Sequence, residues 1–133
     1  MSKEEVIHAY RHLYRAALKA VCYSKPASFV ARDQLRRAFR SRDATFDGRA
    51  IRRTIWLLHN AARERGIEHQ IVRNILLTQF WRSKEGASSW KSIVVESGSK
   101  KKREDLIGET AYAHYEQTIA MLNKTMGLCL PLR

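Results

Sequence analysis

Residues 3–22, KEEVIHAYRHLYRAALKAVC, decide the fold class of this chain. Their apolar side chains recur at intervals of three and four, at Val6, Tyr10, Leu13, Tyr14, Ala17 and Val21. This spacing gathers them on one face of a helix that has about 3.6 residues per turn. We therefore predict an amphipathic helix over residues 3–22, which must bury its apolar face against neighbouring elements.

Two further helices follow from the same reading. Pro26 suits the first turn of a helix over residues 26–41, because a first-turn residue has no intrahelical use for a backbone N–H. Asp47 is predicted to cap the N-terminus of a third helix, and Gly66 to end it. Together with the first helix, these segments predict a three-helix bundle.

The composition changes in the second half of the chain. Residues 68–82 are unusually apolar and predict a fourth helix that is buried on more than one side or docked on a partner. Residues 83–103 are dominated by Ser, Gly and Lys, which is typical of a mobile loop, and residues 105–126 predict a last helix. We expect an all-α protein with a bundle at 1–66 and a helical extension at 67–133.

The bulk composition limits the kinds of partner and activity. The chain has 133 residues, 44% of them hydrophobic, and a formal net charge of +12, which favours partners such as RNA, DNA, anionic lipid or an acidic protein. No apolar run has the length of a membrane span. We find no H-E-x-x-H, no G-x-S-x-G and no phosphate-binding Gly-rich loop, so we predict that the protein is not an enzyme.

Basic residues form stripes along the predicted helices. In residues 26–41, Arg32, Arg36 and Arg40 stand at i, i+4 and i+8. Each such like-charge pair destabilises a helix by about 0.2–0.5 kcal/mol. The stripe therefore predicts a docking face for an acidic partner, and a simply solvated face is the alternative. Because Arg makes bidentate contacts to carboxylate and phosphate alike, acidic protein and nucleic acid both remain open.

Two sequence motifs narrow the choice. Leu13-Tyr14-Arg15 in the first helix is followed by QLRRAFR at residues 34–40 in the second. This pair resembles the LYR-motif family of small mitochondrial matrix proteins, which carry L-Y-R near the N-terminus and R-x-x-F-R about twenty residues later. The resemblance covers residues 3–66. With its long C-terminal extension, the chain is similar to an uncharacterised fungal branch of that family.

The resemblance implies an LYR-type three-helix bundle in the mitochondrial matrix that binds the acidic mitochondrial acyl carrier protein. The chain would have no cofactor of its own, because the carrier brings an acyl-phosphopantetheine whose acyl chain enters the bundle. The residues implied in carrier binding are Leu13, Tyr14, Arg15, Arg32, Arg36, Phe39 and Arg40. Those implied in an acyl channel are Ala17, Ala38, Phe39 and Leu58.

The resemblance leaves the client of such an adaptor open. We favour the large subunit of the mitochondrial ribosome, which the protein would serve as an assembly or accessory factor, with Lys100, Lys101, Lys102 and Arg103 contacting rRNA. The alternative client is a respiratory-chain complex, of which the protein would be a subunit or assembly factor. A free-standing nucleic-acid-binding helical protein is a third reading, which leaves the L-Y-R motif without a role.

Overall fold

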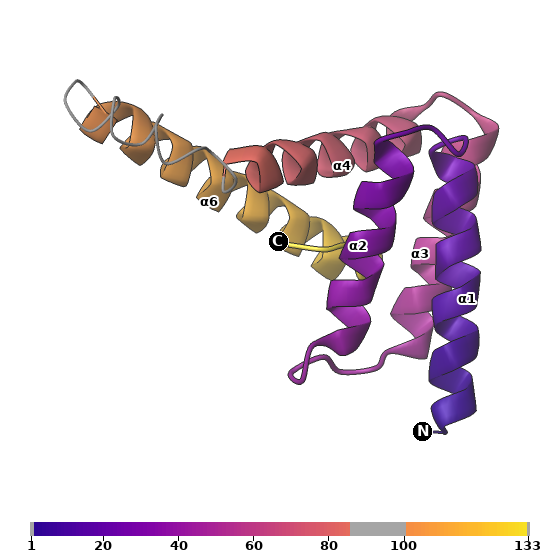
Figure 1. The fold of residues 1–133 in the computed structure, drawn as a ribbon. Coiled ribbons are helices and arrows are strands. Elements are labelled where there is room, and N and C mark those ends of the chain that lie inside the picture. The colour runs from indigo at the N-terminus through magenta and orange to yellow at the C-terminus, as the bar shows by residue number, and fades with distance from the viewer. Residues whose placement is uncertain (1, 86–100, 133) are drawn as a thin grey trace.

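The computed structural model of the chain describes residues 2–85 and 101–132, and these form five helices and no strand (Figure 1). The helices are α1 (Lys3–Ala20), α2 (Ala27–Arg40), α3 (Gly48–Arg63), α4 (Ile67–Glu85) and α6 (Lys101–Met126). The all-α class predicted from the sequence is confirmed. None of the described helices is both long and apolar enough to cross a membrane.

Local side chains fix the beginnings of two helices. Ser2 and Glu5 form a capping box at α1, in which the Glu5 amide donates to Ser2 Oγ at 3.2 Å and the Ser2 amide donates to Glu5 Oε2 at 3.1 Å. At α3, Asp47 Oδ1 accepts from the amides of Arg49 and Ala50 at 2.9 and 3.2 Å. The predicted N-cap at Asp47 is confirmed.

Two predicted helix ends in the bundle are shifted. The first helix ends at Ala20 rather than at residue 22, because Cys22 and Tyr23 take left-handed φ angles of 52° and 55°. Gly66 does not end the third helix, which stops at Arg63. Gly66 instead precedes α4, and its carbonyl accepts from the Gln70 amide at 3.1 Å.

The predicted loop at 83–103 is wrong at both ends. Helix α4 continues to Glu85, and α6 already begins at Lys101, so Lys101, Lys102 and Arg103 are helical. Lys, Arg and Glu are good helix formers, and at residues 101–103 this propensity prevails over the Ser-, Gly- and Lys-rich composition of the segment, which suggested a loop. The rest of the predicted loop, including Lys100, lies outside the described residues.

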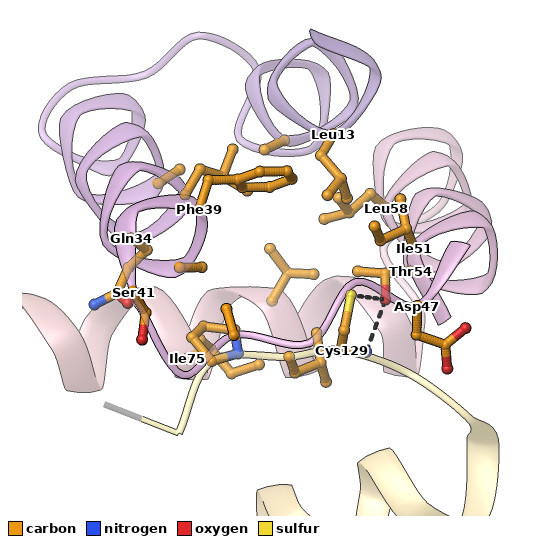
Figure 2. Close-up of a pocket in the computed structure, with 18 of the residues that line it drawn as sticks. Leu13, Gln34, Phe39, Ser41, Asp47, Ile51, Thr54, Leu58, Ile75 and Cys129 are labelled. Carbon is orange, nitrogen blue, oxygen red and sulfur yellow. Dashed lines mark hydrogen bonds between the residues drawn. The ribbon is translucent and has the colours of Figure 1, made fainter. Parts of the chain in front are cut away.

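The first four helices form a ring. Helices α1 and α4 each pack against both α2 and α3, while α2 and α3 face each other across the interior (Figure 2). Small side chains allow close packing of α1, since Ala16, Ala17 and Ala20 are all buried. The alanines of α1 thus let this helix pack closely against both α2 and α3, while α2 and α3 themselves stay apart.

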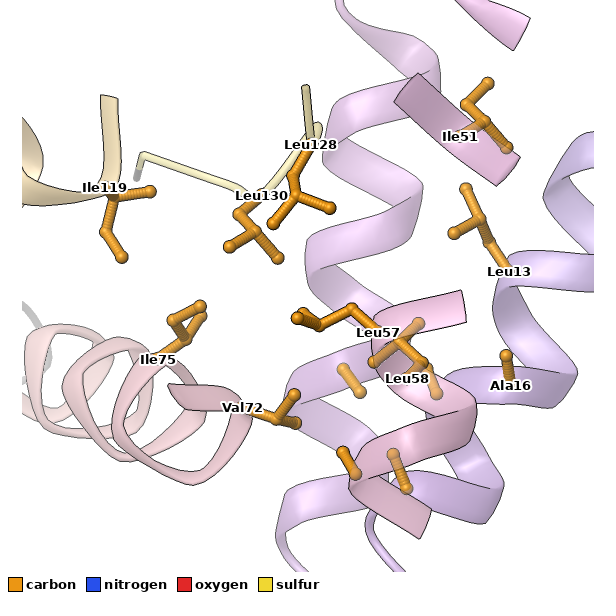
Figure 3. Close-up of a cluster of buried hydrophobic side chains, with 14 residues drawn as sticks. Leu13, Ala16, Ile51, Leu57, Leu58, Val72, Ile75, Ile119, Leu128 and Leu130 are labelled. Atoms are coloured by element: carbon orange, nitrogen blue, oxygen red, sulfur yellow. The ribbon is translucent and has the colours of Figure 1, made fainter. Parts of the chain in front are cut away.

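A hydrophobic cluster crosses the boundary that we drew at residue 66. Leu57 of α3 is completely buried, and the cluster around it contains Val72 and Ile75 of α4, Ile119 of α6 and the residues that follow α6 (Figure 3). The bundle and the extension therefore share one core.

The C-terminal residues turn back onto α3 through a specific cap. Gly127 takes a φ of +64°, and the Leu128 amide donates to the Asn123 carbonyl at 3.1 Å, which is the pattern of a Schellman motif. Arg53 donates from Nη1 to the Met126 carbonyl at 2.9 Å, and a Cβ at position 127 would lie 2.9 Å from the same nitrogen. Asn123 then bonds both backbone groups of Leu130. Residues 127–130 are thus held along the ring.

Candidate functional site

The ring of helices encloses an open cavity of about 460 Å³ (Figure 2). Most of its wall is apolar, and the wall is built by α1, α2, the 41–47 linker, α3, α4 and the C-terminal residues 129–131. An apolar cavity of about 150 Å³ already holds benzene, and pockets for small molecules span about 300–1,000 Å³. The cavity is therefore large enough for a long apolar ligand.

The residues predicted for a channel lie together on this cavity. Ala17 of α1, Ala38 and Phe39 of α2 and Leu58 of α3 all line it, and so does Leu13. Ala17 and Leu58 are buried, whereas Ala38 is open to the cavity. Because Ala has only a methyl group, Ala17 and Ala38 leave open the part of the cavity that larger side chains at these two positions would fill.

The sequence reading missed the residues that complete the wall. Val72 and Ile75 come from α4, and Cys129 and Leu130 come from the tail, although all four were assigned to the extension. The apolar spacing of residues 68–82 was a usable signal for α4. Nothing in the tail sequence indicates the cavity, because the tail reaches it only through the turn at Gly127.

Thr54 and Cys129 form a polar edge of the cavity. Thr54 Oγ1 donates to the Ala50 carbonyl at 2.8 Å and accepts from the Cys129 amide at 3.0 Å, and it lies 3.2 Å from Cys129 Sγ. The side chain of Cys129 is exposed to the cavity. Burial among the surrounding walls raises the pKa of the Cys129 thiol above that of an ordinary cysteine, and the Thr54 hydrogen bond offsets only part of this effect.

Alkylation should report this environment. The thiolate is the reactive form, so a raised pKa lowers its fraction at every pH below that pKa. We expect iodoacetamide to modify Cys129 severalfold more slowly at about pH 8 than Cys22, which lies in the turn after α1, and the rate at Cys129 to rise at higher pH. Mass spectrometry of Cys22→Ser and Cys129→Ser variants measures each thiol separately. Equal rates at all pH values would contradict this picture.

Tyr14 does not line the cavity but is connected to it. Its ring stacks on Tyr10 with the centroids 6.0 Å apart, and Tyr10 meets the edge of Phe39 at 5.3 Å. Tyr14 is half-buried, and the neighbouring Arg15 is exposed. Of the L-Y-R motif, Leu13 therefore lines the cavity, Tyr14 belongs to a series of contacting aromatic rings that reaches Phe39, and Arg15 is exposed to solvent.

The arginines of α2 line a second, open groove. Arg36, Arg37 and Arg40 surround it together with Asp33 and Ser41. Ser41 also lines the apolar cavity, so the groove and the cavity adjoin at the C-terminal end of α2.

Arg32 is not part of this groove. Its Nε lies 3.3 Å from Asp33 Oδ1, and its guanidinium lies 5.2 Å from the centre of the Phe29 ring. The predicted stripe of three arginines is thus divided, and only Arg36 and Arg40 of that stripe share the groove.

The remaining predicted residues lie elsewhere. Lys101, Lys102 and Arg103 form the first turn of α6, at the end that points away from α1 and α3 (Figure 1). Among the described residues, no group of three or more His, Cys, Asp or Glu side chains could hold a metal ion.

One curated protein gives a direct comparison. The UPF0593 mitochondrial protein C806.05 of Schizosaccharomyces pombe is 36% identical to this chain over 87 residues. The aligned region covers 63% of this chain and 70% of that protein. No family model matches the sequence, and no solved structure matches it.

Proposed function

The chain belongs to the family of the UPF0593 mitochondrial protein C806.05, and from this premise we propose that it is a non-catalytic mitochondrial adaptor of the LYR type. Its proposed partner is the acylated acyl carrier protein of the mitochondrial matrix. The acyl chain, carried on phosphopantetheine, would enter the apolar cavity, so the adaptor would need no cofactor of its own.

The observation that carries this proposal is the junction of two unlike surfaces at Ser41. The cavity on one side is apolar, and burial of each methylene of an alkyl chain there is favourable by about 0.8 kcal/mol. The groove on the other side presents Arg36, Arg37 and Arg40. Guanidinium groups suit the phosphate of phosphopantetheine and the carboxylates of an acidic carrier. A ligand that is apolar at one end and anionic at the other fits both surfaces.

The residues take separate roles in this proposal. Leu13, Ala17, Ala38, Phe39 and Leu58 contact the acyl chain, since all five line the cavity. Arg36 and Arg40 contact the carrier protein itself. Tyr14 supports Phe39 through the intervening ring of Tyr10. Arg15 and Arg32 lie outside both concave surfaces, and we assign them to the rim of the carrier interface.

The client of the adaptor is a second part of the proposal. We favour the large subunit of the mitochondrial ribosome, because the net charge of +12 exceeds what the α2 groove alone requires. A respiratory-chain complex is the alternative, favoured by Leu77 and Trp81, which α4 leaves 44% and 55% exposed. A free-standing nucleic-acid-binding protein would have no need of the cavity.

Co-purification tests the proposal directly. We expect the full chain, expressed together with mitochondrial acyl carrier protein, to form a complex whose mass by native mass spectrometry includes an acylated phosphopantetheine. A carrier whose modified serine is replaced by Ala should bind at least about tenfold more weakly, because the buried chain is then missing. Recovery of no carrier in either form would refute the proposal. The proteins recovered with the tagged chain from mitochondria would separate ribosomal from respiratory clients.

A further inference from the structure

The outward face of α3 carries a continuous basic stripe with an aromatic residue at its centre. Its members follow one another at intervals of three and four residues, and all are exposed: Arg49, Arg52, Trp56, His59 and Arg63. Trp56 is 55% exposed, although burial of so large a ring would be favourable. The sequence reading counted these arginines among the basic stripes of the helices and did not single out Trp56.

Helical geometry places this stripe opposite the cavity. The inward residues of α3 include Thr54, Leu57 and Leu58, and at about 100° per residue Trp56 points to the other side of the helix. Helix α2, with its arginine groove, stands across the cavity from α3 (Figure 2). A partner seated on the α2 groove would therefore leave the α3 stripe uncovered.

No ion pair within the described part of the chain involves the arginines of the stripe. The ion pairs of the described part join Arg32 to Asp33 and Arg82 to Glu116. Residues 48–63 contain no Asp or Glu. The nearest preceding carboxylate, that of Asp47, accepts from backbone amides at the helix N-terminus. Arg53, which lies three residues before Trp56, differs from the stripe arginines because it donates to the Met126 carbonyl.

We propose that this stripe binds single-stranded RNA, with a base stacked on Trp56 and phosphates held by Arg49, Arg52 and Arg63. From the first to the last arginine the stripe spans about 21 Å at about 1.5 Å per residue, which is enough for several nucleotides. Stacking on an exposed ring requires an unstacked base, and single-stranded RNA offers one where a duplex does not. This inference does not depend on carrier binding.

The arrangement around Trp56 favours RNA over an acidic protein. In protein interfaces, a Trp anchor usually fills an apolar pocket and is surrounded by residues that exclude water. The exposed neighbours of Trp56 on its helix face are instead cationic, with Arg52 one turn before it and Arg63 two turns after it. A ring flanked by cations matches the alternation of base and phosphate along a single strand.

Fluorescence anisotropy with a fluorescein-labelled, mixed-sequence RNA of about twelve nucleotides tests the proposal on the full chain. We expect Trp56→Ala to weaken binding about tenfold or more. Trp81→Ala is the matched control, because Trp81 on α4 is equally exposed, at 55%, and this variant should bind as the wild type does. Arg52→Gln with Arg63→Gln should flatten the slope of log affinity against log salt by about 1.4. Circular dichroism confirms that each variant keeps its helices.

Three results would overturn the inference. If the Trp56→Ala variant bound the RNA with wild-type affinity, no base would stack on Trp56. Equal competition by a duplex RNA of the same length would show simple polyanion binding, and stronger competition by polyglutamate would assign the stripe to an acidic protein. Arg36→Glu with Arg40→Glu should change RNA affinity by less than about threefold. That variant separates the two proposals, since it should lose the carrier protein and keep the RNA.

Discussion

Arg36→Glu combined with Arg40→Glu is expected to abolish recovery of the acyl carrier protein with the chain. Both side chains are exposed and line the α2 groove, so the change reverses its charge without opening the core. Loss of one partner from a desolvated charge pair costs about 2–5 kcal/mol, and reversal adds repulsion from the acidic carrier. The loss of two such contacts would weaken the complex beyond what co-purification can recover. Co-purification followed by quantitative mass spectrometry measures the result.

The stability cost of this double variant should be small by comparison. The change Arg40→Glu introduces a carboxylate in the last turn of α2, where a negative charge is unfavourable by about 0.3–1 kcal/mol. The milder pair Arg36→Gln and Arg40→Gln avoids that cost and should lose the carrier in part. Far-ultraviolet circular dichroism and thermal unfolding verify that both variants remain folded.

Charge reversal on α3 supplies the matched control. Arg49→Glu with Arg63→Glu makes the same change in net charge on exposed positions of α3, which lies across the cavity from the groove. Carrier recovery should then stay near that of the wild type. Equal loss from the α2 and α3 variants would mean that bulk charge, and not the groove at Ser41, holds the carrier. Full recovery of the carrier protein with the α2 variant would show that the groove does not contact the carrier.

The helical plan of the chain could be predicted because it is encoded locally. Apolar spacing gave the fold class, and a single side chain, that of Asp47, fixed the beginning of α3. The channel positions Ala17, Ala38 and Leu58 could be named from the resemblance to the LYR family, and the structure places them on one cavity. Whether that cavity receives an acyl chain stays a prediction.

The closing of the cavity by the tail could not be predicted from sequence. Thr54 and Cys129 are 75 residues apart, and their contact depends on the left-handed turn at Gly127 and on the hydrogen bond from Arg53 to Met126. Each of these features is unremarkable alone, because Gly commonly follows a helix and Arg commonly lies on a surface. Only their joint position in space directs the tail to the cavity.

The shared core also changes what the C-terminal half contributes. Val72 and Ile75 of α4 and Leu130 of the tail line the cavity, so its wall is incomplete in residues 1–66 alone. Any function of the cavity therefore depends on both halves of the chain. In the adaptor proposal, residues beyond 66 help to hold the acyl chain as well as selecting the client.

Ala38→Phe is expected to weaken binding of the acylated carrier by about a hundredfold while leaving the unacylated carrier unchanged. Ala38 lines the cavity and is open to it, so the added ring enters space that about three or four methylenes would otherwise occupy. At about 0.8 kcal/mol for each methylene, their exclusion costs about 3 kcal/mol. Ala62→Phe is the control, because Ala62 is exposed on α3 and does not line the cavity. Isothermal titration with both carrier forms measures the difference. If Ala38→Phe weakens both forms equally, or if the wild type does not distinguish them, the acyl chain lies outside this cavity.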